Sequence, residues 1–97
     1  PWGPGMEEPK FIIPNAKITS FRRFGSNNEH ASFYISDGSS KKLKVKKFNL
    51  VNNVLNKVFD NFENVNFNFL GTLTIDTWNN NKSIELMLDD IIYSDVT

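Results

Sequence analysis

The sequence predicts one mainly β domain, built from five strands and a single helix. Two patterns carry this prediction. Apolar residues alternate with polar ones through most of the chain, which is typical of strands with one buried face. Over residues 51–62 the apolar spacing changes to that of an α-helix. The length of 97 residues suits one domain with one compact core.

The first half of the chain predicts three strands, at residues 17–24, 30–36 and 42–48. Clusters of turn-forming residues separate them, so we expect two consecutive antiparallel hairpins. Residues 1–10 contain three Pro and two Gly before position 10 and show almost no periodicity, which predicts a linker from a preceding domain. The folded domain is then expected over residues 11–97. The chain opens with Pro1 rather than Met, and we expect it to be a piece of a longer protein.

The second half predicts one helix followed by two strands. One apolar stripe has helical spacing and consists of Val51, Val54, Leu55, Val58, Phe59 and Phe62. Alternation then returns over residues 65–75, and again over residues 84–88 after a turn of three Asn at 79–81. Most aromatic residues belong in cores, and we assign four to this one: Phe21, Phe33, Phe67 and Phe69.

This order, three strands, a helix and two strands, is that of the OB-fold, a partly open five-stranded barrel. Its binding face usually lies on strands 2 and 3, between the loop that joins strands 1 and 2 and the loop that joins strands 4 and 5. Residues that bind a ligand are therefore expected in these three places.

Catalytic groups are scarce in this chain. There is no Cys and one His, so thiol catalysis, disulfides and a zinc site built on cysteines are excluded. Asp89 and Asp90 are adjacent, and neighbouring strand residues face opposite ways, so they do not easily share one ion. We expect no catalytic centre, metal or cofactor in these residues.

The charged residues balance in number but not in position. There are 11 basic and 11 acidic residues, so bulk charge does not indicate a nucleic-acid binder. Ten of the 11 basic residues precede residue 60, however, and five Lys fall within residues 41–47. Any electrostatic attraction for a polyanion must come from this uneven distribution.

The third expected strand carries the basic residues in a regular pattern. Leu43 and Val45 face one side of the strand and Lys42, Lys44 and Lys46 the other, where ideal alternation also places Phe48. Such a row could follow a phosphate backbone while the aromatic ring stacks on a base. Lysines on an exposed strand can equally serve to prevent edge-to-edge aggregation.

The two loops add further candidates. The connection of strands 1 and 2 supplies Arg22, Arg23 and His30, and we expect His30 to be structural or a minor binding contact rather than catalytic. The connection of strands 4 and 5 supplies Trp78 and Lys82. Trp78 is either a platform on which a base stacks or a plug over the end of the barrel.

Both ends of the chain resemble the OB domain of the RecJ family. The resemblance lies in residues 1–11, in the strand and loop at 69–80 and in the last strand at 84–91, while Gly25, His30 and Phe33 fit the first hairpin and Phe48 and Asn49 the end of strand 3. The chain departs from the family at four positions. Asp76 stands where the family often has Asn, Asn80 where it has Gly, Glu85 where it has Gln, and Met6 where it has Asn.

The resemblance implies a parent enzyme that degrades single-stranded DNA from 5′ to 3′ in repair and recombination. Its nuclease core would carry Asp-His-His motifs and use Mn²⁺ or Mg²⁺, and these motifs are absent here, so the fragment is not expected to be an enzyme. The fragment's role would be to hold single-stranded DNA beside the nuclease core of the same chain. Phosphates would then contact Lys44, Lys46, Arg22 and Arg23, and bases would stack on Trp78 and Phe48.

A second function remains open at this point: an architectural domain that docks the nuclease core or a repair partner without binding DNA. The zero net charge favours docking, whereas the basic strand and the polar Trp loop favour DNA binding. We further expect a monomer. The absence of Cys fits a cytoplasmic location, and the absence of an apolar run of membrane-spanning length predicts no membrane contact.

Overall fold

The computed structural model describes residues 9–93, apart from the side chains of Asp76 and Trp78. Five strands and one helix follow the predicted order. They are β1 (Phe11–Phe24), β2 (His30–Ser36), β3 (Leu43–Lys47), α1 (Leu55–Asp60), β4 (Phe67–Trp78) and β5 (Asn81–Tyr93). The mainly β class and the position of the helix are therefore confirmed.

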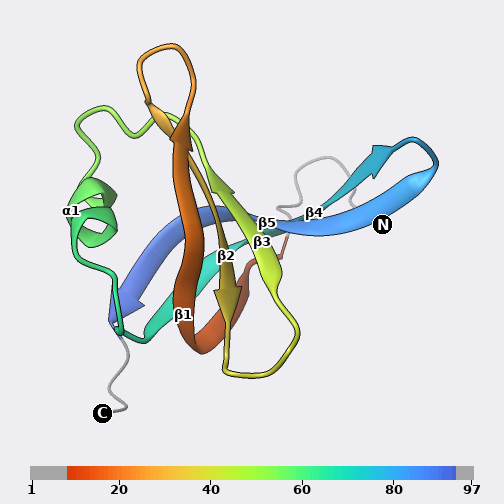
Figure 1. Ribbon diagram of the computed structural model, residues 1–97, viewed down its shortest axis with the longest axis horizontal. Helices are drawn as coiled ribbons and strands as arrows, with labels where there is room; N and C mark the ends of the chain where they lie inside the picture. The colour runs from red at the N-terminus through yellow and green to blue at the C-terminus, as the bar shows by residue number, and fades with distance from the viewer. Residues whose placement is uncertain (1–8, 94–97) are drawn as a thin grey trace.

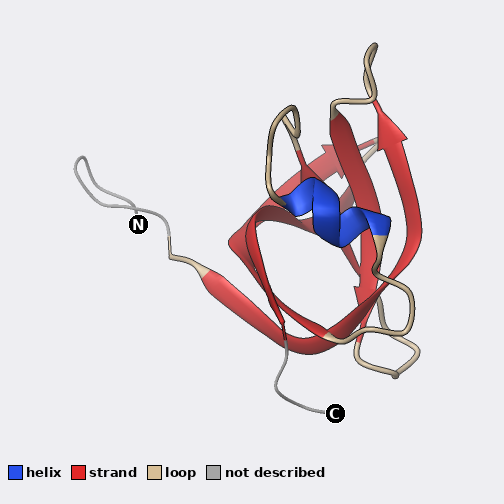
Figure 2. Cartoon of the chain, turned by 90° about the vertical axis from the view of Figure 1, so that its left-hand side faces the viewer, coloured by secondary structure: helices blue, strands red, loops and turns tan. Residues whose placement is uncertain are grey.

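The five strands form a closed barrel in the order β1-β2-β3-β5-β4, and β1 closes it by pairing with β4. All neighbouring strands are antiparallel except β3 and β5, which run parallel. Figure 2 looks into the ring of strands and shows α1 lying across one of its ends. In Figure 1 the end of β4 and the start of β5, on either side of the turn at Asn79 and Asn80, extend away from the barrel as an arm. This connectivity is that of the OB-fold.

Strand β1 begins at Phe11, whereas the sequence predicted a start at residue 17. The strand bends twice, and its pairing register shifts between Ile13 and Ala16 and again between Thr19 and Arg22. Bulges of this kind bend and twist a strand. They let the first half of β1 pair with β4 and the second half with β2, which closes the barrel.

Helix α1 is shorter than the apolar stripe predicted. Val51 and Val54 are exposed, at 69% and 78%, and lie before the helix. Asn52 has a φ of 60°, which an α-helix does not accommodate, and the Asn53 side chain accepts a hydrogen bond from the Leu55 backbone N–H at 2.8 Å. The helical periodicity was therefore right in type and wrong in extent, because local Asn geometry delays the helix start.

The core contains the aromatic residues assigned to it. Phe33, Phe67 and Phe69 are fully buried, and Phe21 is half-buried against Phe33 and Phe59. The Phe33 and Phe59 ring centroids lie 5.4 Å apart, so α1 contributes an aromatic ring that seals one end of the barrel. The helix among residues 9–93 is too short and too polar to cross a membrane.

Asparagine provides most of the tight turns. Among residues 9–93, eight residues other than Gly have a positive φ, and seven of these are Asn. Asn79 and Asn80, with φ of 49° and 65°, form a two-residue connection between the paired residues at the ends of β4 and β5. Positive φ at both central residues is what a type I′ hairpin turn requires, and Asn adopts it more readily than most residues. This turn fixes the register of the arm.

Candidate nucleic-acid interface

Two rows of side chains cross the outer face of β2, β3 and β5. The register pairs Tyr34 with Lys44 and Lys44 with Glu85, and it pairs Ser32 with Lys46 and Lys46 with Met87. Residues paired directly across a sheet point to the same side of it. Phe33 and Val45, which alternate with these rows, are fully buried in the barrel. The predicted division of β3 into an apolar inner face and a basic outer face is therefore present in the structure.

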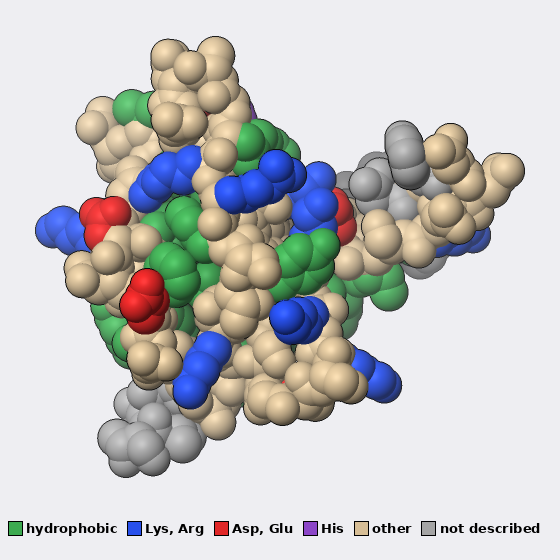
Figure 3. All heavy atoms as spheres, in the orientation of Figure 1, with side chains coloured by type: hydrophobic (Ala, Val, Ile, Leu, Met, Phe, Trp, Pro, Cys, Tyr) green, Lys and Arg blue, Asp and Glu red, His purple; other side chains and the backbone are tan. Residues whose placement is uncertain are grey.

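A groove of about 680 Å³ lies between this outer face and the arm. Its polar and charged lining side chains come from β2, from β3 with the residue before it, and from the start of β5. They are Tyr34, Lys42, Lys44, Asn81, Lys82, Ser83 and Glu85. Because Tyr34 is 37% exposed, an aromatic ring is available among the cationic groups. Figure 3 shows Lys and Arg side chains spread over the side of the molecule formed by β1, β2 and β3, next to exposed hydrophobic side chains.

Glu85 lies beneath two of the lysines. Its side chain is 6% exposed, and Oε2 lies 3.3 Å from Lys46 Nζ and 3.8 Å from Lys44 Nζ. The two lysine side chains are 25% and 31% exposed, so they separate the carboxylate from solvent. Glu85 therefore partly neutralises the positive charge of the lysine row that was predicted to follow a phosphate backbone.

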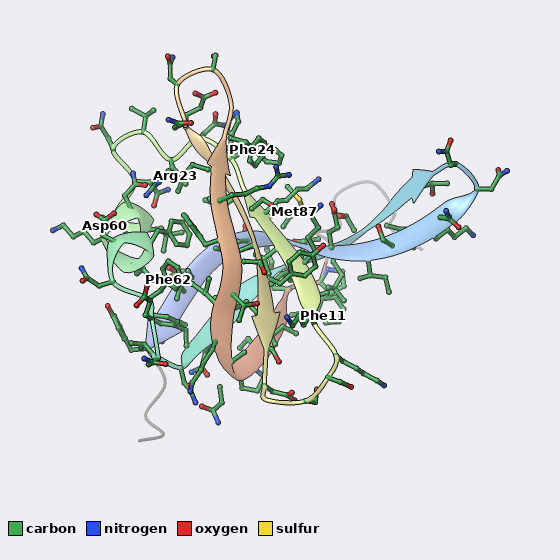
Figure 4. All side chains as sticks on the ribbon, viewed as in Figure 1. Phe11, Arg23, Phe24, Asp60, Phe62 and Met87 are labelled. Carbon is green, nitrogen blue, oxygen red and sulfur yellow. The ribbon has the colours of Figure 1, made fainter. Side chains whose placement is uncertain are left out.

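The two adjacent arginines face opposite sides of β1. Arg22 is paired with Ser32 and exposed on the outer face. Arg23 points toward α1, where its guanidinium donates to Asn56 Oδ1 at 2.9 Å and lies 3.8 Å from Asp60 Oδ1. Figure 4 shows Arg23 and Asp60 on the helix side of the molecule. Arg23 therefore holds the helix against the barrel and does not join Arg22 on the outer face.

His30 and Phe48 belong to an aromatic cluster with Phe24, beside the connection of β1 and β2. Phe48 follows the end of β3 and is 37% exposed, and its ring centroid lies 5.0 Å from that of His30 and 5.8 Å from that of Phe24. His30 Nδ1 accepts a hydrogen bond from the Asn49 backbone N–H at 3.1 Å, and Nε2 lies 3.2 Å from Glu29 Oε1. His30 therefore orders the loops, while Phe48 presents the more exposed ring.

The arm carries the two candidates from the connection of β4 and β5. Lys82 is exposed at the start of β5 and lines the groove. Trp78, predicted either to stack on a base or to plug the barrel end, is the last residue of β4, and its side chain lies outside the described part of the chain. The sequence reasoning missed Tyr34 and the position of Glu85. Alternation could have found Tyr34, because it falls between two residues predicted to face the core, Phe33 and Ile35.

The loop from β2 to β3 is held by its own side chains. The backbone N–H of Ser39 donates to Asp37 Oδ1 at 3.0 Å, and this bond lowers the pKa of Asp37 below its usual value. A lowered pKa means that the bond stabilises the turn at neutral pH and that this contribution is lost as the pH falls through the lowered value. The turn leads directly to Lys42.

The carboxylates at the end of β5 are occupied by local contacts. Asp89 Oδ2 lies 2.6 Å from Lys10 Nζ, and Asp90 Oδ1 accepts a hydrogen bond from the Ile91 backbone N–H at 2.8 Å. Across residues 9–93, no three His, Cys, Asp or Glu side chains gather in a way that could hold a metal ion.

Comparisons with known proteins agree with this architecture. The chain matches the crystal structure of the mitochondrial single-stranded DNA binding protein Rim1 of S. cerevisiae with a TM-score of 0.68 and 13% identity, over 90% of this chain and 96% of that one. At this identity the likeness shows the fold. A search of curated proteins gives no match. The family model described as the RecJ OB domain matches residues 1–90. The chain therefore belongs to the RecJ OB domain family.

Proposed function

We propose that this domain binds single-stranded DNA along the outer face of β2 and β3, in the groove closed on one side by the arm. The observation that carries the proposal is the exposed ring of Tyr34 among the side chains of Lys42, Lys44 and Lys82 in that groove. Single-strand binders combine a positive groove that follows the backbone with aromatic rings on which bases stack. The OB-fold neighbour that is itself a single-stranded DNA binding protein supports the same reading.

The proposed path has two places where a base could stack. Tyr34 provides one on the barrel face, and the cluster of Phe24, His30 and Phe48 provides the other at the end of β3. Arg22 of β1, Ser32 of β2 and Lys46 of β3 are paired in register and form one row across the sheet. The phosphates between the two stacked bases would then lie close to Arg22 and Lys46.

Within a longer protein the domain would supply substrate capture. The family supports a parent that degrades single-stranded DNA from 5′ to 3′ in repair and recombination, with Mn²⁺ or Mg²⁺ bound in a separate nuclease core. A cytoplasmic location and a monomeric domain are part of this proposal. A tethered module raises the effective concentration of the strand near the core even if its own affinity is modest.

A titration with a fluorescently labelled oligo(dT) at several salt concentrations tests the proposal. Tyr34→Ala is expected to weaken binding by about tenfold, because loss of one base–aromatic stack costs about 1–3 kcal/mol. Lys42→Ala is expected to make the log–log salt slope shallower by about 0.7, the contribution of one phosphate on a single strand.

The matched control is Lys57→Ala, which removes a lysine of the same charge from α1, away from the groove. Equal effects of Lys42→Ala and Lys57→Ala on the slope would argue against this face. Absence of binding at low salt in the unaltered domain would overturn the proposed function.

Docking to protein is the second candidate function, and a specific surface favours it. Phe11, Ile75 and Ile84 are exposed, at 41%, 70% and 58%, and line a groove with Leu73 on the side of the arm. If the domain docks on the nuclease core through this surface, calorimetry with the separated core should detect binding that Ile75→Ser/Ile84→Ser abolishes. The same double variant should leave the stability of the domain nearly unchanged, because both side chains are largely in solvent.

A further inference from the structure

Glu85 occupies an unusual place for an acidic residue, at the floor of a groove proposed to bind a polyanion. Among the described side chains that line this groove, Glu85 is the acidic one. A single oxygen, Oε2, lies within 4 Å of two ammonium groups, those of Lys44 and Lys46. A phosphate oxygen of bound DNA would make the same contacts with the same two groups.

The backbone gives Glu85 little freedom to leave this position. It lies within β5, where it is paired with Lys44 on the parallel strand β3 and with Thr74 on the antiparallel strand β4. Its side chain is 6% exposed, whereas those of the two lysines reach solvent. When an anion arrives, the lysines can therefore turn outward more easily than the carboxylate can withdraw.

We infer that Glu85 is a built-in competitor of phosphate, which sets the affinity of this site below what its lysines could provide. The inference rests on the proposed function. The two ammonium groups and the carboxylate together carry a net charge of +1, and an incoming phosphate must either share the lysines with Glu85 or draw one of them away. Since a buried carboxylate without a partner is costly, drawing both lysines away is opposed.

Glu85→Gln tests the inference because it removes the charge and keeps the shape. The net charge of the group rises from +1 to +2, so one more counterion is available for release. We expect oligo(dT) to bind roughly three- to tenfold more tightly at low salt, with a log–log slope steeper by about 0.7. A role limited to folding would change the melting temperature and leave the slope unaltered.

Asp89→Asn is the matched control. It changes the total charge of the protein by the same amount and lies on the same strand, but Asp89 contacts Lys10 and does not line the groove. A gain in affinity for oligo(dT) that depends only on overall charge should appear equally in both variants. A gain that depends on Lys44 and Lys46 should appear in Glu85→Gln alone.

A second probe, inorganic tripolyphosphate, separates this inference from the proposed function. Its binding is followed through the backbone amide shifts of Lys44 and Lys46 by NMR. If Glu85→Gln strengthens tripolyphosphate binding while neither form binds oligo(dT), the inference holds and single-strand binding fails. If Glu85→Gln matches Asp89→Asn with both probes, or weakens binding to either, Glu85 does not compete with phosphate and the inference is overturned.

Discussion

Replacing Lys44 and Lys46 together with Ala is expected to lower the free energy of unfolding of the domain by about 3 kcal/mol. This loss of stability is separate from any effect on DNA binding. The reason is the Glu85 carboxylate, which is 6% exposed and whose ion-pair partners among the described residues are these two lysines. Removing both leaves a buried charge without compensation, and truncating one side of such a pair costs far more than the pair contributes. Chemical denaturation of the double variant measures the effect.

The triple variant Lys44→Ala/Lys46→Ala/Glu85→Gln is the control for this mechanism. It lacks the buried charge and should recover most of the lost free energy of unfolding, while its DNA affinity stays low. Lys42→Ala/Lys82→Ala also removes two lysines, both of which line the groove, and leaves Glu85 paired with Lys44 and Lys46, so its stability should stay near that of the parent. A triple variant as unstable as the double variant would show that the lysine stems, rather than the charge, stabilise this face.

Gly71→Ala is expected to cost about 3 kcal/mol of unfolding free energy, at the upper end of what overpacking a core costs. A Cβ at Gly71 would overlap the backbone carbonyl oxygen of Met87, and it would lie 3.1 Å from Leu86 Cδ1. The obstacle is backbone, so a rotamer change cannot remove it. For a domain of this size each kcal/mol corresponds to about 4–8 °C in melting temperature.

The position explains why no side chain fits at Gly71. The register of β4 and β5 shifts between Leu70 and Gly71, and Gly71 also pairs with Phe11 where β1 closes the barrel. Gly38→Ala is the comparison, because an added Cβ meets no atom within 4 Å there and only its φ of +102° opposes the change, at about 1 kcal/mol. Thermal melts that show equal losses for both variants would contradict the steric explanation.

The sequence by itself determined the order of the elements, the barrel class and most of the core. Alternation marked Phe33 and Val45 as inward and the lysines of β3 as outward, because period-two spacing divides any strand into two faces. The same argument could have placed Tyr34 on the outer face. The family was also within reach of the sequence, since the residues that resemble RecJ stand at both ends of the chain.

Only the tertiary structure decided which charged groups are available to a ligand. The bulge between Thr19 and Arg22 changes the phase of β1, so Arg22 faces outward and Arg23 turns to α1. Bulges interrupt the period on which sequence reasoning depends. The parallel pairing of β3 with β5 brings Glu85 beneath Lys44 and Lys46 across some 40 residues of chain. Contacts between segments so distant in sequence follow from barrel closure, and local sequence patterns do not predict them.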